Sequence, residues 1–218
     1  MYGFGMFDEP TYLDPHSEVR IHGRKLPHWQ QDERTYFVTF RLADSLPREL
    51  MVKWKEEREQ WLLRNPKPWD EKTELIYYRQ FSGRIDAMLD HGHGKCFLRS
   101  PEAASEVSKV MLRFDGERYR MWSLVVMPNH VHLVFSLPSE QGLPELMRAW
   151  KGVSARKVNA ITARSGELWQ QDYFDRLIRD HEHFVRVVRY VRRNPVKAGL
   201  AVEEYLVWES SLVKEWLG

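Results

Sequence analysis

The sequence predicts an α+β protein in which helices pack mainly on one face of an antiparallel sheet. Three observations indicate this class. Short β-rich runs and longer amphipathic stretches follow each other in the order strand, helices, two strands, helix, strand, helix. Two of the β-rich runs are separated by only two residues, which is hairpin spacing. With 218 residues, 43% of them hydrophobic, the chain is long enough to bury one sizeable core.

The first half contains one strand and three helical stretches. Residues 35–42, TYFVTFRL, are β-rich without interruption, which is typical of a buried central strand. Residues 46–64 and 71–90 have helical composition and are separated by the breaker NPKPWD. Ser100 followed by Pro101 predicts the start of another helix, with serine as the cap and proline at the first helical position.

The second half supplies the hairpin and two more helices. The β-rich runs RYRMWSLVVM and HVHLVFSL flank Pro128 and Asn129, and together they predict the hairpin. A helix with basic residues on its outside is expected next, followed by a loop with an edge strand, and then by a last helix capped by Asp180 and terminated by Pro195 and Gly199. These three segments span residues 143–162, 166–179 and 181–194.

Composition narrows the class of protein and of site. No apolar run reaches the length of about 18 residues that a membrane span needs, and the first 20 residues lack the basic and then apolar pattern of a signal peptide. We therefore expect a soluble, cytoplasmic protein without a membrane partner. Cys96 is the single cysteine. An internal disulfide and a cysteine-based zinc cluster are excluded, so any metal site must use histidine with oxygen or amide ligands.

Positive charge is concentrated in the last third of the chain. The net charge is only +2, but residues 143–200 contain 12 Lys and Arg against 6 Asp and Glu. Such a segment is either a set of solvated helix faces or the binding surface for a polyanion.

The motif MPNHVHLV, residues 127–134, places His130 and His132 one residue apart in a strand pattern. Because side chains alternate along a strand, both imidazoles point to one face while Val131 and Leu133 point to the other. Their Cα atoms are expected about 6.6 to 6.8 Å apart, a distance from which two imidazoles can reach one metal ion. The alternative is that each ring satisfies an ordinary hydrogen bond in the core.

The predicted last helix has two neighbouring stripes at 100° per residue. The apolar stripe, which must face the sheet, consists of Phe184, Val187, Val188 and Val191. The second stripe consists of His183, Arg186, Tyr190 and Asn194. Tyr190 and Asn194 lie one turn apart on one face, so a phenol and a carboxamide border the buried seam where they could face the histidine strand. The alternatives are an ordinary half-buried tyrosine and a helix-terminal asparagine ahead of Pro195.

Three motifs together carry a resemblance to a known family. MPNHVHLV, WQQDYFDRLIRD and RYVRRNPVKAGL resemble the REP-associated tyrosine transposases, relatives of the smallest bacterial insertion-sequence transposases within the HUH superfamily of single-strand nucleases. The resemblance extends from about Tyr36 to Leu200. It implies a ferredoxin-like α+β sandwich. The long N-terminal arm and the helical stretch around 46–90 depart from the compact members. The implied domains are an N-terminal arm (1–30), a catalytic domain (31–200) with a helical insertion (about 46–90), and a C-terminal tail (201–218).

The resemblance also implies roles for single residues. His130, His132 and Asn194 would bind a divalent metal, Mg²⁺ or Mn²⁺, and Tyr190 would be the nucleophile. The activity would be cleavage and strand transfer of single-stranded, hairpin (REP-like) DNA through a 5′-phosphotyrosine, by a monomer or a homodimer. The DNA-binding residues expected on the two basic helices are Arg148, Lys151, Arg156, Lys157, Arg186, Arg189, Arg193 and Lys197.

Several alternatives stay open at the level of sequence. Tyr173 is a competing nucleophile, although a packing role fits its loop or strand position better. His91 and His93 also have metal-binding spacing, but their flanking glycines favour a flexible turn. The protein could be a DNA-hairpin-binding descendant that no longer cuts, or a metal-dependent hydrolase of small molecules, which would leave the basic last third without a role.

Overall fold

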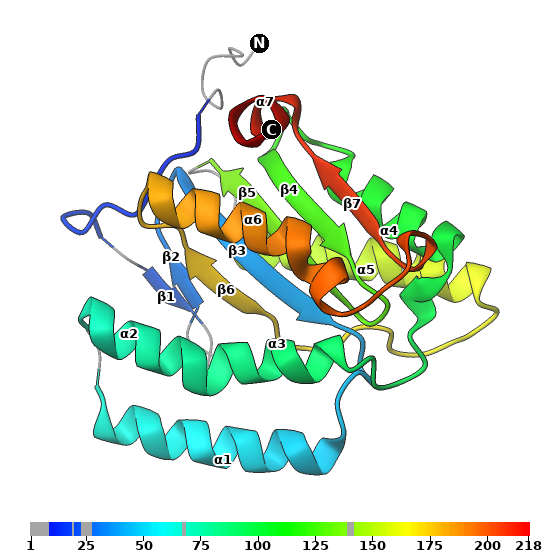
Figure 1. The fold of residues 1–218 in the computed structure, drawn as a ribbon, viewed down its shortest axis with the longest axis horizontal. Coiled ribbons are helices and arrows are strands. Elements are labelled where there is room, and N and C mark those ends of the chain that lie inside the picture. The colour runs from blue at the N-terminus through cyan, green and yellow to red at the C-terminus, as the bar shows by residue number, and fades with distance from the viewer. Residues whose placement is uncertain (1–8, 19, 23–27, 67–68, 139–141) are drawn as a thin grey trace.

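The computed structural model describes residues 9–18, 20–22, 28–66, 69–138 and 142–218. Its centre is a five-stranded antiparallel sheet in the order β6-β3-β5-β4-β7 (Figure 1). The strands of this sheet are β3 (Arg34–Arg41), β4 (Arg120–Val126), β5 (His130–Leu137), β6 (Phe174–Leu177) and β7 (Leu206–Glu209). A separate two-stranded sheet pairs β1 (Arg20–His22) with β2 (His28–Gln30).

Seven α-helices and three short helical turns surround the sheet in the described part of the chain. The α-helices are α1 (Arg48–Arg64), α2 (Glu71–Tyr77), α3 (Gly83–Asp90), α4 (Pro101–Leu112), α5 (Leu143–Ile161), α6 (His181–Lys197) and α7 (Ser211–Leu217). The turns are a π-helical turn η1 (Tyr78–Ser82) and the 3-10 turns η2 (Phe97–Arg99) and η3 (Val202–Glu204). No described helix has the length and apolar character needed to cross a membrane.

The predicted α+β class and ferredoxin-like topology are confirmed. Strands β3, β4, β5 and β6 alternate with α4 and α5 as strand, helix, two strands, helix, strand. In the sheet, the fourth of these strands lies beside the first, and the third separates the first from the second. Strand β7 extends the sheet beside β4. The hairpin β4–β5 closes through Pro128 and Asn129, with the Met127 N–H donating to the His130 carbonyl at 2.8 Å.

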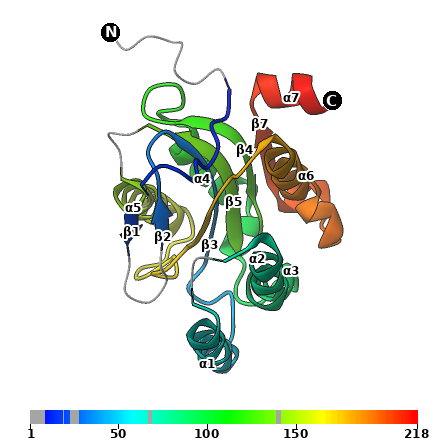
Figure 2. The same cartoon turned by 90° about the vertical axis from the view of Figure 1, so that its left-hand side faces the viewer.

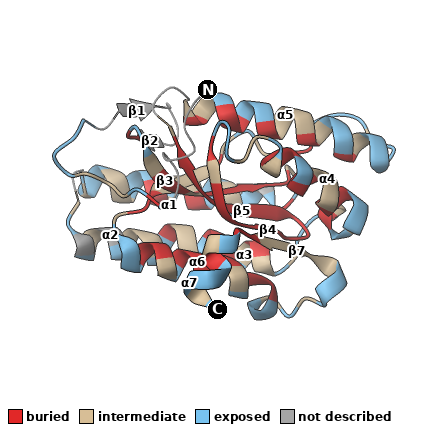
Figure 3. Ribbon diagram, turned by 90° about the horizontal axis from the view of Figure 1, so that it is seen from above, coloured by how far each residue is buried: buried red, intermediate tan, exposed pale blue. Residues whose placement is uncertain are grey.

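Helices cover both faces of the sheet, which corrects the expectation that they lie mainly on one. Helices α4 and α5, which connect the ferredoxin-like strands, do share one face, whereas α6 and α7 cover the other (Figures 1 and 2). The physical reason is visible in β5, which is buried at every position (Figure 3). Val131 and Leu133 pack toward α4 and α5, and Val134 packs toward α6. A strand that is apolar on both sides needs cover on both sides.

The expected helical stretch around 46–90 forms a hairpin with a small core of its own. Helix α1 runs back against a second rod made of α2, η1 and α3 (Figure 1). Its buried core consists of Leu46, Trp54, Phe81, Ile85 and Leu89, and Phe174 of β6 packs against it. The ring of Trp54 meets that of Phe174 at 5.7 Å between centroids, so this contact joins the helical hairpin to the sheet edge.

Helix α6 begins as predicted and ends later than predicted. The Asp180 carboxylate accepts from the His183 N–H at 2.7 Å and so caps the first turn. The helix then continues through Pro195 to Lys197, which corrects the expectation that the proline terminates it. A proline removes one donor from a helix, and this one lies in the last turn, where Gly199 (φ +68°) ends it. Residues 201–218, expected as a tail, form η3, β7 and α7.

Candidate active site

The two histidines converge on one buried point of the α6 face. His130 and His132 are 1% and 0% exposed, and their Nε2 atoms lie 3.0 Å apart. The Nδ1 atom of each ring lies within hydrogen-bonding distance of a second side chain. Asn129 Oδ1 lies 2.7 Å from His130 Nδ1, and Thr39 Oγ1 lies 2.7 Å from His132 Nδ1. Thr39 is opposite His132 in the β3–β5 ladder, so its hydroxyl reaches the ring across the sheet.

The contacts of Asn129 determine the tautomer of His130. The Asn129 side-chain N–H₂ donates to the carbonyls of Leu89 and His93, at 3.2 Å each. Its Oδ1 therefore faces His130 and must accept a hydrogen bond from Nδ1–H. The Nε2 of His130 is left with a free lone pair that points at His132. That lone pair is the electron pair a metal ligand needs.

The donor set fits a divalent cation. When the Thr39 hydroxyl accepts from His132 Nδ1–H, the Nε2 atoms of both rings present lone pairs to the same point. Two nitrogens bound at about 2.1 Å and at a right angle lie about 3 Å apart, which matches the observed separation of the Nε2 atoms. Burial lowers the pKa of His130 to about 3. Burial also lowers the pKa of His132 well below its usual value, and the nearby charges of His130 and Lys197 lower it further. Both rings are therefore neutral, as ligands must be.

Asn194 of α6 adds the third group to this point. It is 1% exposed, and its Nδ2 lies 3.1 Å from His132 Nε2. Its Oδ1 is buried without a hydrogen-bond partner, which is uncommon in a native structure and is the oxygen that a cation would take. Among the described residues, no three His, Cys, Asp or Glu side chains form a ligand group. A site here therefore depends on the amide of Asn194.

Tyr190 lies one helical turn before Asn194 and packs its ring against the histidines. The ring centroids of Tyr190 and His132 are 5.4 Å apart, and Phe37 contacts both rings, at 5.9 and 5.5 Å. The expectation that α6 faces the histidine strand with its phenol and amide is confirmed by these contacts.

The Tyr190 hydroxyl is directed toward α3. It is buried and has no well-aligned hydrogen-bond partner, but the carboxyl of Asp86 lies close enough to act on it. Burial raises the pKa of Tyr190, and the charges of Asp86 and Tyr78 raise it further. Burial also raises the pKa of Asp86 to about 7. The phenol therefore stays protonated at neutral pH unless its surroundings change.

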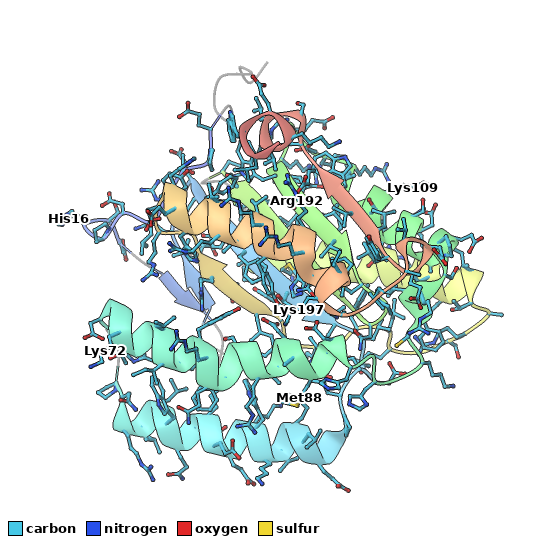
Figure 4. All side chains as sticks on the ribbon, viewed as in Figure 1. His16, Lys72, Met88, Lys109, Arg192 and Lys197 are labelled. Atoms are coloured by element: carbon cyan, nitrogen blue, oxygen red, sulfur yellow. The ribbon has the colours of Figure 1, made fainter. Side chains whose placement is uncertain are left out.

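The helices α6 and α3 close over the site together. The Lys197 ammonium, at the end of α6 that faces α3 (Figure 4), forms an ion pair with Asp90 at 2.8 Å between Nζ and Oδ2. The Asn129 amide is bonded to the end of α3 and to the turn after it. With both histidines and Asn194 at 1% exposure or less, a phosphate reaches them only if α6 or α3 moves.

The predicted DNA-binding residues fall on opposite faces of the molecule. Arg148, Lys151, Arg156 and Lys157 belong to α5, and Arg186, Arg189, Arg193 and Lys197 belong to α6, on the histidine face. Several of these side chains already form hydrogen bonds or ion pairs with other residues of the protein. Lys151 donates to the carbonyls of Gln170 and Gln171 at 2.6 Å each, and burial lowers its pKa to about 8. Ion pairs join Lys157 to Glu106, Arg186 to Glu182 and Lys197 to Asp90.

The side chains of the alternative site residues do not join the histidine pair in the described part of the chain. Tyr173 is 8% exposed and belongs to the core between the sheet and α5, on the opposite face, and burial raises its pKa. Its position fits the packing role. His91 and His93 lie in the turn after α3, both exposed, with ring centroids 6.2 Å apart.

Three supporting residues were not predicted from the sequence. Asp86 comes from α3, Thr39 from β3, and Asn129 was read only as a turn residue. For Asn129 a signal existed, because it immediately precedes His130 in MPNHVH. Asp86 and Thr39 lie in separate segments of the chain and carry no local pattern that links them to the histidines.

Comparison with known proteins shows which family the site region resembles. Residues 102–194 match the model of the IS200-like transposases, a stretch that runs from α4 to Asn194 and contains both histidines and Tyr190. The ISDra2 transposase TnpA of Deinococcus radiodurans is 35% identical over 57 residues, which is 23% of this chain and 41% of that protein. A Haemophilus influenzae protein described only as uncharacterized is 26% identical over 99 residues, which is 35% of this chain and 54% of that protein.

The chain thus covers about half the length, or less, of these two relatives. A solved structure of a REP-associated tyrosine transposase bound to a REP hairpin is 17% identical, with a TM-score of 0.43, over 83% of this chain and 76% of that one. The resemblance first carried by the three sequence motifs is confirmed by the match to the IS200-like transposase model, which covers residues 102–194, from α4 to Asn194 on α6.

Proposed function

We propose that the protein is a metal-dependent endonuclease and strand transferase that acts on single-stranded, hairpin-forming DNA through a 5′-phosphotyrosine at Tyr190. One observation carries the proposal. Two imidazole nitrogens 3.0 Å apart, an amide with an unpartnered oxygen and the ring of a tyrosine come together at one buried point, from one strand and one helix.

The roles of the residues follow from their chemistry. His130, His132 and Asn194 would hold Mg²⁺ or Mn²⁺. When bound, such an ion neutralises charge on the scissile phosphate and orients it. The Tyr190 oxygen forms a bond to phosphorus while the bond from phosphorus to the 3′ oxygen breaks. The tyrosine proton leaves toward Asp86, whose carboxyl acts on the hydroxyl, and the 3′ oxygen departs and is protonated as a 3′-OH.

The covalent product explains strand transfer. A phosphotyrosine keeps one phosphoester bond for each one that is broken, so a 3′-OH of another strand can attack it and release Tyr190. The proposal of a hairpin substrate draws on the solved REP-associated tyrosine transposase, which is bound to a REP hairpin, and on the match of residues 102–194 to the IS200-like transposases. Cytoplasmic location and a monomeric or dimeric state remain part of the proposal.

The test is a covalent-adduct assay. The protein is incubated with a labelled single-stranded hairpin oligonucleotide and Mn²⁺, denatured and separated on a gel, and the modified peptide is identified by mass spectrometry. The native chain should give an adduct at Tyr190 that EDTA abolishes. Tyr190→Phe should lose the adduct and keep DNA binding, and His130→Ala with His132→Ala should lose it as well. An adduct in Tyr190→Phe would refute the assignment of the nucleophile, and hairpin binding without any adduct would favour the non-cutting descendant.

A further inference from the structure

A second cavity, outside the histidine site, lies between the helical insertion and the sheet edge. It has a volume of about 190 Å³ and is enclosed by α1, the end of β3 and the segment that leads into β6. Its lining includes Arg41, Trp54, Lys55, Arg58, Gln170 and Asp172. The lining thus combines charged and amide side chains with aromatic rings.

The cavity is next to the histidine site. Arg41 lies opposite His130 in the β3–β5 ladder, and directly paired residues point to the same face of a sheet with Cα atoms about 5 Å apart. The Arg41 side chain therefore starts beside the histidine pair and extends into the cavity. A DNA strand whose phosphate is held at the histidines would have its neighbouring nucleotide within reach of this cavity.

The walls of the cavity are fixed before any ligand arrives. The Gln170 N–H donates to the Arg41 carbonyl at 2.8 Å. Lys151 of α5 holds the carbonyls of Gln170 and Gln171 at 2.6 Å each. On the other wall, Arg58 Nε donates to the Tyr77 hydroxyl at 2.6 Å. A preformed, partly aromatic pocket with a few fixed polar groups is typical of ligand sites.

The polar groups of the cavity match one nucleobase best. Arg41 is 4% exposed and donates to the Ser45 hydroxyl at 3.1 Å, and the Asp172 carboxylate lies close enough to interact with its charge. A guanidinium beside a carboxylate presents donors and acceptors side by side. Guanine offers O6 and N7 as acceptors for the arginine, and its N1–H and N2–H₂ as donors for the carboxylate. Thymine offers the carboxylate a single N–H and cytosine a single amino group, so neither makes the two-point contact that guanine makes through N1–H and N2–H₂.

The size of the cavity agrees with a single base. Pockets for drug-sized ligands have volumes of about 300–1,000 Å³, so a cavity of about 190 Å³ suits one ring system better than a whole oligonucleotide. Trp54 and Phe174 supply the aromatic wall against which an unstacked base can pack.

We propose that this cavity binds one unstacked guanine of the DNA strand whose neighbouring phosphate is held at the histidine site. The inference rests on the proposed function for the source of the base. It assigns to the helical insertion, through α1, the reading of one position of the DNA sequence.

The experiment measures binding without cleavage. Fluorescein-labelled oligothymidines that carry a single guanine at each position in turn are titrated with the Tyr190→Phe protein in Mn²⁺, which leaves the metal in place and prevents cleavage, and dissociation constants are obtained from anisotropy. At one position guanine should bind at least tenfold tighter than thymine, and free dGMP, but not TMP, should compete that preference away. Equal binding at every position overturns the proposal. A response to dGMP without any preference along the oligonucleotide also overturns it, because the site would then serve a free nucleotide.

Variants separate the cavity from general charge effects. Asp172→Asn keeps the shape and removes the carboxylate, so the preference for guanine should fall to less than threefold; if the preference survives, the cavity is not its source. Lys55→Ala should weaken binding of the guanine oligonucleotide, whereas Lys53→Ala, exposed on the same helix and outside the cavity, should leave it unchanged. The adduct assay on the same variants keeps the two proposals apart. An adduct without guanine preference refutes this inference alone, and guanine preference without an adduct refutes only the proposed function.

Discussion

Single side chains behind the histidines orient the two rings that are proposed to hold an ion. Asn129 is the clearest case, because it orients His130 through Oδ1 and is itself held by two carbonyls at the end of the helical insertion. Such supporting groups fix the tautomer and the orientation of a ligating ring.

Removal of this support should weaken metal binding. In Asn129→Ala, His130 loses the acceptor that keeps its proton on Nδ1, so Mn²⁺ affinity should fall roughly 10- to 100-fold. Mn²⁺ binding is measured by electron paramagnetic resonance, which detects the free ion. Tyr173→Phe, on the opposite face, is the matched control and should bind Mn²⁺ like the native chain. Unchanged affinity in Asn129→Ala would contradict the role of Asn129 in orienting His130 as a ligand.

Asp86 makes the folded state sensitive to pH. Burial raises its pKa to about 7 in the folded protein, compared with 3.8 in the unfolded chain. Between these pH values the folded protein keeps a proton that the unfolded chain has released. The stability that Asp86 contributes to the folded state is therefore complete below about pH 4 and is lost as the pH rises through 7. At about 1.4 kcal/mol per pKa unit, the free energy of unfolding falls by at most about 4 kcal/mol over this range.

An uncharged isostere should remove this loss. Asp86→Asn should raise the free energy of unfolding at pH 8 and change it much less at pH 4. Urea denaturation at both pH values provides the comparison, with the pH 4 result serving as the control for effects of shape. A variant that is no more stable than the native chain at pH 8 would mean that the carboxyl is ionised in the fold without penalty.

The sequence predicted the centre of the site better than its surroundings. His130, His132, Tyr190 and Asn194 lie on one strand and one helix, where alternation and the 3.6-residue period already tell which side chains share a face. Asp86 meets Tyr190 only because the insertion folds back onto α6. Arg41 reaches the second cavity only through the register between β3 and β5. Such pairings depend on tertiary structure and leave no local pattern.

At the scale of elements, the helical insertion is a unit with its own core. Helices α1 and α3 bury Trp54, Ile85 and Leu89 among themselves, and Phe174 is the sheet residue that packs against this cluster. The sequence predicted the helices but not this arrangement, because the continuous rod contains a π-helical turn at Tyr78–Ser82 that shifts the buried face by inserting a residue.

The insertion should therefore unfold locally when its core is damaged. Trp54 is 2% exposed, and truncation of a buried tryptophan costs about 3–5 kcal/mol. In Trp54→Ala, hydrogen exchange should become faster across residues 48–90, while β4 and β5 keep their protection. Hydrogen exchange with mass spectrometry resolves these segments, and Lys53→Ala on the exposed side of α1 is the control. Equal loss of protection in β5 would show that the insertion and the sheet unfold as one unit.

At the scale of the whole molecule, the charges are divided between two faces by the sheet. The excess of positive charge in residues 143–200 was visible in the sequence, but its division between α5 and α6 was not, because both helices have basic outer sides and only the chain path places them on opposite layers (Figure 2). Under the proposed function, a DNA strand at the histidine site would contact the α6 face of the sheet and not the α5 face.

Arginines of α6 should accordingly account for more of the salt-dependent DNA affinity than the lysine of α5. Arg189 and Arg193 are exposed and make no ion pair within the described residues, whereas Lys157 is paired with Glu106 at 2.6 Å on the other face. Each phosphate contact adds about 0.9 to the slope of log affinity against log salt. The double variant Arg189→Ala and Arg193→Ala should therefore lower that slope by about 2 for hairpin DNA, and Lys157→Ala by much less than 1. Fluorescence anisotropy between 50 and 200 mM salt gives both slopes. A larger change for Lys157→Ala would place the DNA on the α5 face, away from Tyr190.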